Sequence, residues 1–224
     1  MRDAKRAERC WGIFVLFALV LISMFVFGCM QQTPLVGEGR GEEMVANGKK
    51  VLMVIAPTNF RDEEYLEPRS VFEKAGVNVT VASKGTGIAT GMLGVKVAVD
   101  IDIADADVSE YDAVVFIGGA GSAVYFNDST ALSMAKESFA QGKITAAICI
   151  ASSILANAGV LKSKNATSWP SEQQNIEAKG GHYTGDLVTQ DGKIITGKGP
   201  AAATQFGKKV VEALSGTPST SSSG

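Results

Sequence analysis

The chain has 224 residues, which is room for one domain of ordinary size plus terminal extensions. Its formal net charge of -2 gives no electrostatic reason to expect nucleic-acid binding. It contains three cysteines, none in a C-x-x-C pair, and a single histidine, so the sequence argues against a His/Cys metal cage and against a disulfide framework.

Residues 1–30 combine a basic start with an apolar run that carries no charge. The basic residues are Arg2, Lys5, Arg6 and Arg9. The run over residues 11–27 is longer than a usual signal-peptide core and short for a membrane span. Residues 26–29, Val-Phe-Gly-Cys, resemble a lipobox, in which Cys29 would be lipidated. We expect an uncleaved membrane anchor or a lipoprotein signal, with the rest of the chain on the extracytoplasmic side.

Residues 31–48 are rich in Gln, Thr, Pro, Gly and Glu, which predicts a flexible linker. Residues 49–214 alternate apolar runs with helical patterns and form the predicted globular domain. Residues 215–224 are nearly all Ser, Thr, Gly and Pro, which predicts a disordered tail.

Within the domain, continuous apolar runs predict strands buried on both faces. In chain order we expect a strand over 51–56, a helix over 64–75, a strand over 77–82, a hairpin arm over 95–99, a strand over 113–117, a helix over 129–140, a strand over 144–148, a helix over 150–158, a strand over 193–196 and a last helix with an apolar stripe from Ala203 to Leu214. Pro68 is acceptable only in the first turn of its helix. Repeated strand-helix units predict a mainly parallel sheet covered by helices on both faces, an α/β three-layer sandwich.

Cys149 lies where the strand over 144–148 meets the helix over 150–158. A sharp turn there would push the thiol out of the sheet, and the first free N–H groups of the helix would favour its anionic form. This position predicts a nucleophile or a redox-sensitive thiolate. A small buried core residue is the alternative, because cysteine is often buried.

Two further features follow strands whose carboxyl ends would share one edge of the sheet, where ligands collect in such folds. Gly118 and Gly119 lack side chains, so their N–H groups could approach a reacting carbonyl. Residues 62–64, Asp-Glu-Glu, could supply a carboxyl group to a nearby thiol. A simple turn and a helix-dipole pairing are the structural alternatives.

Six segments in chain order resemble the DJ-one/PfpI (ThiJ) family, flavodoxin-like relatives of the class I glutamine amidotransferases. They are residues 60–64 with Pro68, 111–119, 146–149, 155–161, 180–183 and 191–196. The resemblance implies that Cys149 is the reactive cysteine and Glu64 its buried acid partner. It also implies that the N–H groups of Gly119 and Ile150, beside Gly118, form an oxyanion pocket.

Neither histidine that branches of this family carry is present. The protease-like branch has histidine directly after the cysteine, where this chain has Ile150, and the other branch has it before a proline, where this chain has Trp169. His182 lies outside the usual catalytic position, so we expect it to have a structural role. Without a positioned imidazole, amide hydrolysis lacks its obvious proton donor.

The resemblance therefore implies a cysteine-dependent enzyme that acts on small reactive carbonyls, like a glyoxalase or deglycase, or an oxidative-stress protein. Two alternatives stay open: a non-catalytic binding or chaperone-like module, and a cysteine peptidase or amidase that takes a histidine from a neighbouring subunit. No cofactor is expected, because no phosphate-cradling glycine motif occurs. The expected partners are a small-molecule substrate of unknown identity, the membrane through the N-terminal segment, and a second copy in a homodimer or higher homo-oligomer.

Overall fold

The computed structural model describes residues 45–216. The predicted anchor over 1–30 with Cys29, most of the linker and nearly all of the tail lie outside these residues. Within the described part, no helix is long and apolar enough to cross a membrane. Ala46, inside the predicted linker, is buried, and its N–H donates to the Ala75 carbonyl at 2.8 Å.

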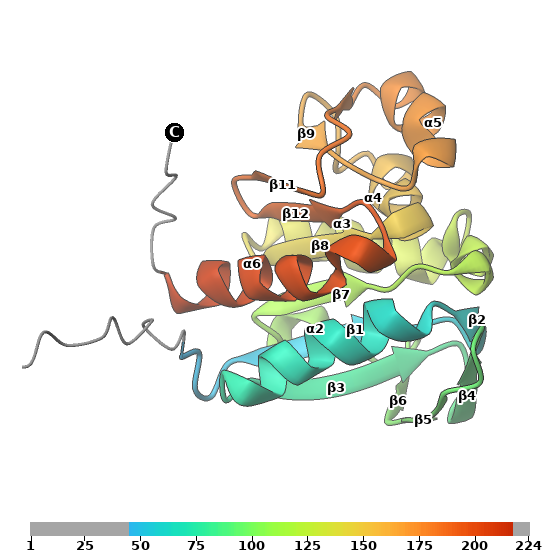
Figure 1. Cartoon of the computed structure of the whole chain (residues 1–224), viewed down its shortest axis with the longest axis vertical. Helices are drawn as coiled ribbons and strands as arrows, with labels where there is room; N and C mark the ends of the chain where they lie inside the picture. Colours follow the sequence, from blue (N-terminus) through green and yellow to red (C-terminus); the bar gives the residue numbers. More distant parts are fainter. Residues whose placement is uncertain (1–44, 217–224) are drawn as a thin grey trace, which may run out of the picture. The chain divides into compact units, whose positions relative to one another are not determined.

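A seven-stranded sheet forms the centre of the domain (Figure 1). Its strands are β1 (Lys50–Val54), β3 (Asn78–Ser83), β6 (Ile101–Asp102), β7 (Ala113–Phe116), β8 (Ile144–Ile148), β11 (Val188–Asp191) and β12 (Ile194–Gly197). Their order across the sheet is β11-β12-β8-β7-β1-β3-β6, and every neighbouring pair is parallel except β11 with β12. The predicted mainly parallel sheet is confirmed.

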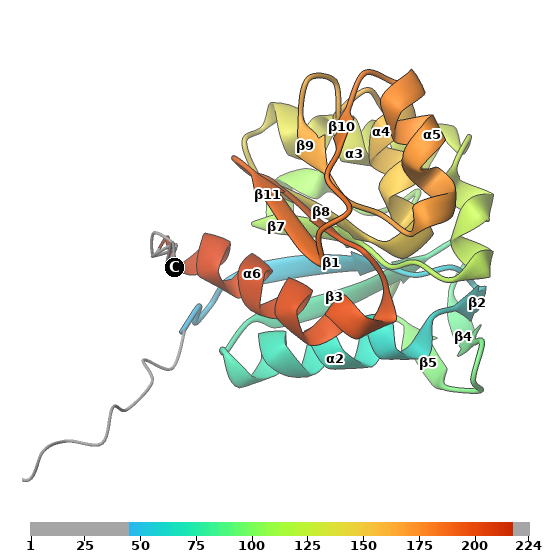
Figure 2. The same cartoon turned by 45° about the horizontal axis from the view of Figure 1, so that its top comes forward.

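Helices cover both faces of this sheet, as expected of a three-layer sandwich (Figure 2). One face carries α2 (Asp62–Lys74) and α6 (Ala203–Ser215), and the other carries α3 (Ser129–Ala140) and α4 (Ser152–Asn157). The helix α5 (Gln173–Ala178) packs beside α4. The apolar stripe predicted for the last helix is buried in α6.

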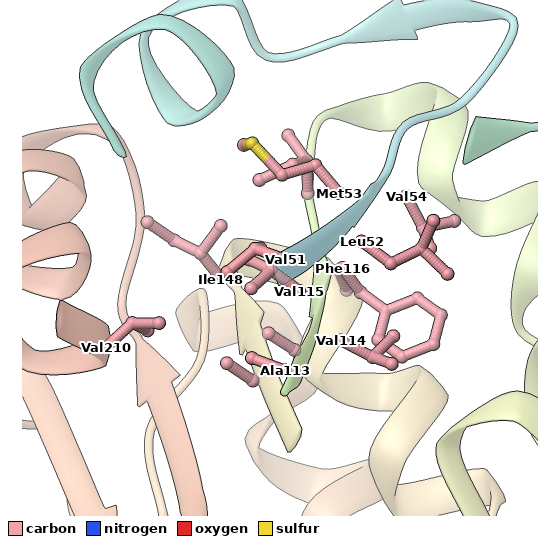
Figure 3. Packing of buried hydrophobic residues seen from close by; sticks show 14 of the residues in the cluster. Val51, Leu52, Met53, Val54, Ala113, Val114, Val115, Phe116, Ile148 and Val210 are labelled. Carbon is pink, nitrogen blue, oxygen red and sulfur yellow. The ribbon is translucent and has the colours of Figure 1, made fainter. Parts of the chain in front are cut away.

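The strands β1 and β7 lie in the core of the domain, because both are buried along their apolar runs. Leu52 pairs with Val114 and Val54 with Phe116 in the register of the two strands, and these side chains share one face of the sheet (Figure 3). Val210 of α6 packs on the opposite face. This core fixes the strand ends that carry the candidate site.

Pro68 lies in the second turn of α2, not in the first as the sequence predicted, because the helix begins at Asp62 rather than Glu64. Its missing N–H leaves the ladder short of one hydrogen bond. The proline packs closely against α6: a Cβ added at Gly207 would lie 2.8 Å from Pro68 Cα. Close packing of the two helices is therefore possible only with glycine at that position.

The short elements were not predicted from the sequence. They are β2 (Thr58–Phe60), β4 (Gly87–Gly91), β6, β9 (Asn165–Ala166), β10 (His182–Tyr183), β11, α5 and five 3-10 turns, η1 (Val108–Glu110), η2 (Ala120–Tyr125), η3 (Cys149–Ala151), η4 (Pro170–Glu172) and η5 (Pro200–Ala202). The predicted hairpin arm is β5 (Lys96–Val99), which pairs antiparallel with β4. β4 in turn pairs with β2 in a small separate sheet.

Candidate active site

The site lies at the carboxyl edge of the central sheet, where three adjacent parallel strands end. β1, β7 and β8 are neighbours, so the segments that follow them meet there. Gly118 and Cys149 follow β7 and β8 within two residues, while Glu64 arrives through β2 and the first turn of α2. The three predicted features are therefore brought together by the sheet order.

Cys149 is the first residue of η3 and occupies the left-handed region, with φ of 61°. This conformation is uncommon for a residue with a side chain and marks a sharp strand-to-helix turn. Only 8% of the residue is exposed. The backbone N–H groups of Gly119 and Ile150 bond to its sulfur and lower its pKa. The elbow predicted from the sequence is present, and two amides face the thiol.

Two glycines let the backbone come close to this thiol. A Cβ at Gly118 would lie 2.6 Å from both Cys149 Cβ and Glu64 Oε2, so no side chain fits between the thiol and the carboxyl. Gly119 has φ of 92°, and a Cβ there would lie 2.3 Å from the backbone nitrogen of Arg61. Both positions require glycine for steric reasons.

Glu64 faces Cys149 from the first turn of α2 and is fully buried. Burial raises the pKa of its carboxyl to about 7, while the Cys149 thiol, the Arg61 cation and the Gly118 N–H lower it. Neither carboxyl oxygen has a hydrogen-bond partner of normal geometry among the described residues. Because few protein hydrogen bonds replace those that the Glu64 carboxyl would make with water, burial favours its protonated form.

The pKa of the Cys149 thiol is raised to about 12, first by burial and then by the negative charge of Glu64. The amides of Gly119 and Ile150 act in the opposite direction but do not outweigh burial. This result differs from the expectation that the helix terminus would favour the thiolate. Of the two groups, Glu64 therefore gives up its proton first, near neutrality, while the thiol keeps its own.

The three acidic residues at the start of α2 have three separate functions. Asp62 is buried and accepts hydrogen bonds from the N–H groups of Leu93 and Val95 at 2.8 and 2.9 Å, which holds the β4–β5 turn. Glu63 pairs with Arg61, whose Nε lies 2.8 Å from its Oε2. Of the three carboxyl groups, Glu64 is the one that lines the cavity beside Cys149.

A cavity of about 320 Å³ opens onto the pair. Its lining consists of Arg61, Glu64, Met92, Gly119, Ala120, Cys149, Ile150, Trp169, Ser171 and Pro200. The sequence analysis did not place Arg61, Met92, Ala120, Ser171 or Pro200 in the site. These residues lie in turns or short elements, where no periodicity marks them.

Ile150 and Trp169, which stand where family branches carry histidine, both line the cavity. His182 is exposed in β10 and is not part of the lining. Within residues 45–216, no group of three His, Cys, Asp or Glu side chains could hold a metal ion. The titratable groups of the cavity are therefore a thiol, a carboxyl and a guanidinium.

The family model for the DJ-1/PfpI family matches residues 49–213. The chain belongs to the DJ-1/PfpI family. It is 38% identical over 200 residues to an uncharacterized protein of Methanocaldococcus jannaschii, covering 88% of this chain and 96% of that one. It is 32% identical to a deglycase of Pyrococcus horikoshii, over 74% of this chain and 99% of the relative.

Solved structures of the DJ-1/PfpI family share the fold. A ThiJ/PfpI domain protein from Brachyspira murdochii matches with a TM-score of 0.74 and 33% identity, over 76% of this chain and all of that chain. DJ-1beta of Drosophila melanogaster matches with a TM-score of 0.69 and 32% identity, over 75% of this chain and 91% of the other. The family and the flavodoxin-like α/β fold implied by the sequence motifs are confirmed.

Proposed function

We propose that this member of the DJ-1/PfpI family is a cysteine-dependent enzyme that converts small 2-oxoaldehydes, or their adducts, into 2-hydroxy acids. One observation carries the proposal: a buried carboxyl with a pKa of about 7 faces a thiol that also receives two backbone N–H groups. Relatives from Pyrococcus horikoshii and Pyrococcus furiosus are named deglycases, which supports carbonyl chemistry at the level of the family.

In the first step, Cys149 Sγ attacks the aldehyde carbon and forms a carbon–sulfur bond. The thiol proton passes to the Glu64 carboxylate as the bond forms, so a free thiolate need not accumulate despite its raised pKa. The aldehyde oxygen becomes negatively charged, and the N–H groups of Gly119 and Ile150 could stabilise it. Glu64 then returns the proton to this oxygen, which gives a hemithioacetal.

In the second step, Glu64 takes the proton from the former aldehyde carbon and delivers it to the oxygen of the adjacent carbonyl, which gives an enediol. The hydroxyl on the sulfur-bearing carbon then gives up its proton, which Glu64 delivers to the adjacent carbon. This shift through an enediol gives the Cys149 thioester of a 2-hydroxy acid. Water then cleaves the thioester, which releases the acid and restores the thiol. The sum is one aldehyde plus one water giving one 2-hydroxy acid, with no external oxidant. A base with a pKa near the working pH suits both proton transfers.

The cavity offers little support for a peptidase. Departure of an amine needs a proton donor on the leaving-group side, a role that imidazole fills in cysteine peptidases. Ile150 and Trp169 occupy the relevant wall, and the histidine of the chain lies elsewhere. Glu64 is the proton-carrying group with a pKa near neutrality, and it is already committed to the thiol.

One observation favours a second candidate, a binding module without catalysis: burial raises the pKa of the thiol. Alkylation by iodoacetamide separates the two. The tryptic peptide over residues 144–162 contains Cys149 as its single cysteine, so the rate can be followed by mass spectrometry in the full chain. An enzyme predicts a rate that rises with a midpoint near pH 7, whereas a binding module predicts negligible labelling up to the pH at which free cysteine reacts.

The decisive test is turnover of methylglyoxal to lactate by the full chain and by Cys149→Ser. We expect the substitution to lower the rate by about a thousandfold or more, because the nucleophile is removed. Cys10→Ser is the matched control, since Cys10 lies outside the domain, and it should leave the rate unchanged. Equal rates in Cys149→Ser and wild type would refute the proposal.

We also propose that the protein works as a homodimer or higher homo-oligomer held at a membrane by residues 1–30, with the domain on the extracytoplasmic side. The self-association is inferred from the family, and the attachment from the apolar leader. Membrane fractionation of cells with residues 1–30 intact or deleted tests the attachment, and light scattering of the detergent-solubilised chain tests the assembly.

A further inference from the structure

We propose that the cavity beside Cys149 selects 2-oxoaldehydes that carry an aryl or branched alkyl group, and that Trp169 is the residue that contacts this group. The inference rests on the proposed function and adds the substrate class. It is based on how the lining of the cavity is arranged. The reactive groups lie together at one side, the floor, and mainly apolar side chains form the rest, the wall.

The reactive groups are gathered at one side of the cavity. Cys149 and Glu64 are almost or fully buried, and the Gly119 N–H points at the sulfur. A 2-oxoaldehyde that reacts there must have both of its carbonyl oxygens at this floor. The remainder of the molecule therefore extends toward the other lining residues.

Those other residues are mainly apolar and come from separate segments of the chain. The apolar ones are Met92, Ala120, Ile150, Trp169 and Pro200, and the polar ones are Arg61 and Ser171. The cavity volume of about 320 Å³ lies at the lower end of the range of small-molecule sites. Methylglyoxal would leave most of this apolar surface in contact with water, whereas a phenyl or isopropyl substituent would cover it.

Trp169 is the largest of these side chains and is held in a defined position. A Cβ at Gly199 would lie 2.8 Å from Trp169 Cε3, so the ring packs directly against the backbone of this glycine. The residue still keeps 47% of its surface exposed. An indole that is fixed in place and open to the cavity can stack on an apolar group without first losing its own freedom.

Arg61, the cationic residue of the cavity lining, does not favour a negatively charged substituent on the substrate. The Arg61 guanidinium is engaged by Glu63 through two contacts, at 2.8 and 2.9 Å, which neutralise it. Glu64 lies nearby and carries negative charge once it ionises. A carboxylate on the substrate would gain little from this arrangement, so the apolar surface decides the preference.

The test compares kcat/KM for phenylglyoxal, isopropylglyoxal and methylglyoxal in the full chain, from initial rates of 2-hydroxy acid formation. Intact-mass measurement after each assay shows that arginine residues are unmodified. We expect phenylglyoxal and isopropylglyoxal to exceed methylglyoxal by about tenfold or more, the size of effect that an apolar pocket produces. Equal values, or a preference for methylglyoxal, would overturn the proposal.

Trp169→Ala should lower kcat/KM for phenylglyoxal by about tenfold more than that for methylglyoxal, whereas Trp169→Phe should retain most of the preference. Phe139→Ala is the matched control, because Phe139 is an exposed aromatic residue on α3 outside the cavity lining. Met92→Ala should weaken the preference to a smaller extent. An equal loss for both substrates in Trp169→Ala would contradict a specificity role.

A binding measurement keeps this inference separate from the proposed function. The chain has two tryptophans, so Trp11→Phe leaves Trp169 as the single emitter. Acetophenone should quench its emission at concentrations at least about tenfold lower than acetone. If no 2-oxoaldehyde is turned over but this difference is found, the reaction is wrong and the apolar subsite stands. Equal quenching by the two ketones would overturn the subsite.

Discussion

On opposite sides of the first turn of α2, two buried carboxyl groups have different surroundings. On the hairpin side, Asp62 accepts two backbone N–H groups from the β4–β5 turn, at 2.8 and 2.9 Å. On the cavity side, Glu64 has no hydrogen-bond partner of normal geometry among the described residues, and its pKa is raised to about 7. Both are buried and lie two residues apart.

This difference explains why one carboxyl group stabilises the fold while the other can transfer protons. Asp62 exchanges its water for donors that are fixed by a turn, so the charge is accommodated and joins two elements. Glu64 loses its water without full replacement, so its proton is held more tightly than in water and is released only near neutral pH. Whether a buried carboxyl group is compensated for its lost water depends on the hydrogen-bond donors that other segments supply, not on its position in the helix.

Of the effects expected from the difference between Glu64 and Asp62, the largest is on the rate of turnover. Glu64→Gln should lower 2-oxoaldehyde turnover by about a hundredfold to ten-thousandfold, because the group that transfers protons is lost while its shape is kept. Asp62→Asn should leave turnover per folded molecule close to wild type. Rates normalised to the folded fraction measured by circular dichroism test this, and equal losses in the two variants would remove the distinction.

The hairpin side predicts an effect on stability. Asp62→Ala should lower the free energy of unfolding by about 4 kcal/mol, since it removes two hydrogen bonds to a charged acceptor and leaves two N–H groups unpaired. Urea unfolding measures this. Glu67→Ala is the control, because this partly exposed carboxyl on the same helix accepts one solvent-exposed hydrogen bond from Thr204 and should contribute less than about 1 kcal/mol. A loss at Asp62 no larger than at Glu67 would contradict the structural role.

The cavity side predicts a smaller, pH-dependent effect on stability. Because the folded-state pKa of Glu64 is raised from 4.5 to about 7, the folded protein binds this proton more tightly than the unfolded chain does. The associated stability is fully present below pH 4.5 and is lost as the pH rises to about 7, by about 3 kcal/mol.

Glu64→Gln removes this dependence, while the other carboxyl groups are common to both proteins. The difference in unfolding free energy between the variant and wild type should therefore shift in favour of the variant by about 3 kcal/mol between pH 4.5 and pH 8. Urea unfolding at several pH values gives this difference. A constant value over that range would mean that Glu64 titrates normally.

The long elements were predictable because periodicity needs length. The predicted helix over 129–140 and strand over 144–148 have the bounds of α3 and β8. The strands β2, β9 and β10 have two or three residues, too few to show a pattern. The Asn59 backbone of β2 nevertheless lies against Gly119, so an element that the sequence did not reveal helps to place the amide at the thiol.

The thiol and the glycines of the site were predictable from the sequence, but most residues that line the rest of the cavity were not. Cys149 was predictable because a cysteine between a buried strand and a helix is a local feature. Trp169 was noted from the sequence as standing where a family branch carries histidine, and its ring packs on Gly199 and lines the cavity. Its neighbours there come from distant turns, so no local pattern could place them.

By itself, the sequence determined the layered α/β fold and the strand ends at which chemistry is possible, because burial patterns and strand-to-helix turns are local properties of the chain. The family resemblance implied that Glu64 is the acid that faces the thiol, but only the tertiary structure decided in which direction the thiol pKa moves. Successive side chains of a helix point about 100° apart, so only one can meet Cys149. Desolvation depends on atoms from segments far away in the sequence, so no local pattern could predict the titration of the Cys149–Glu64 pair.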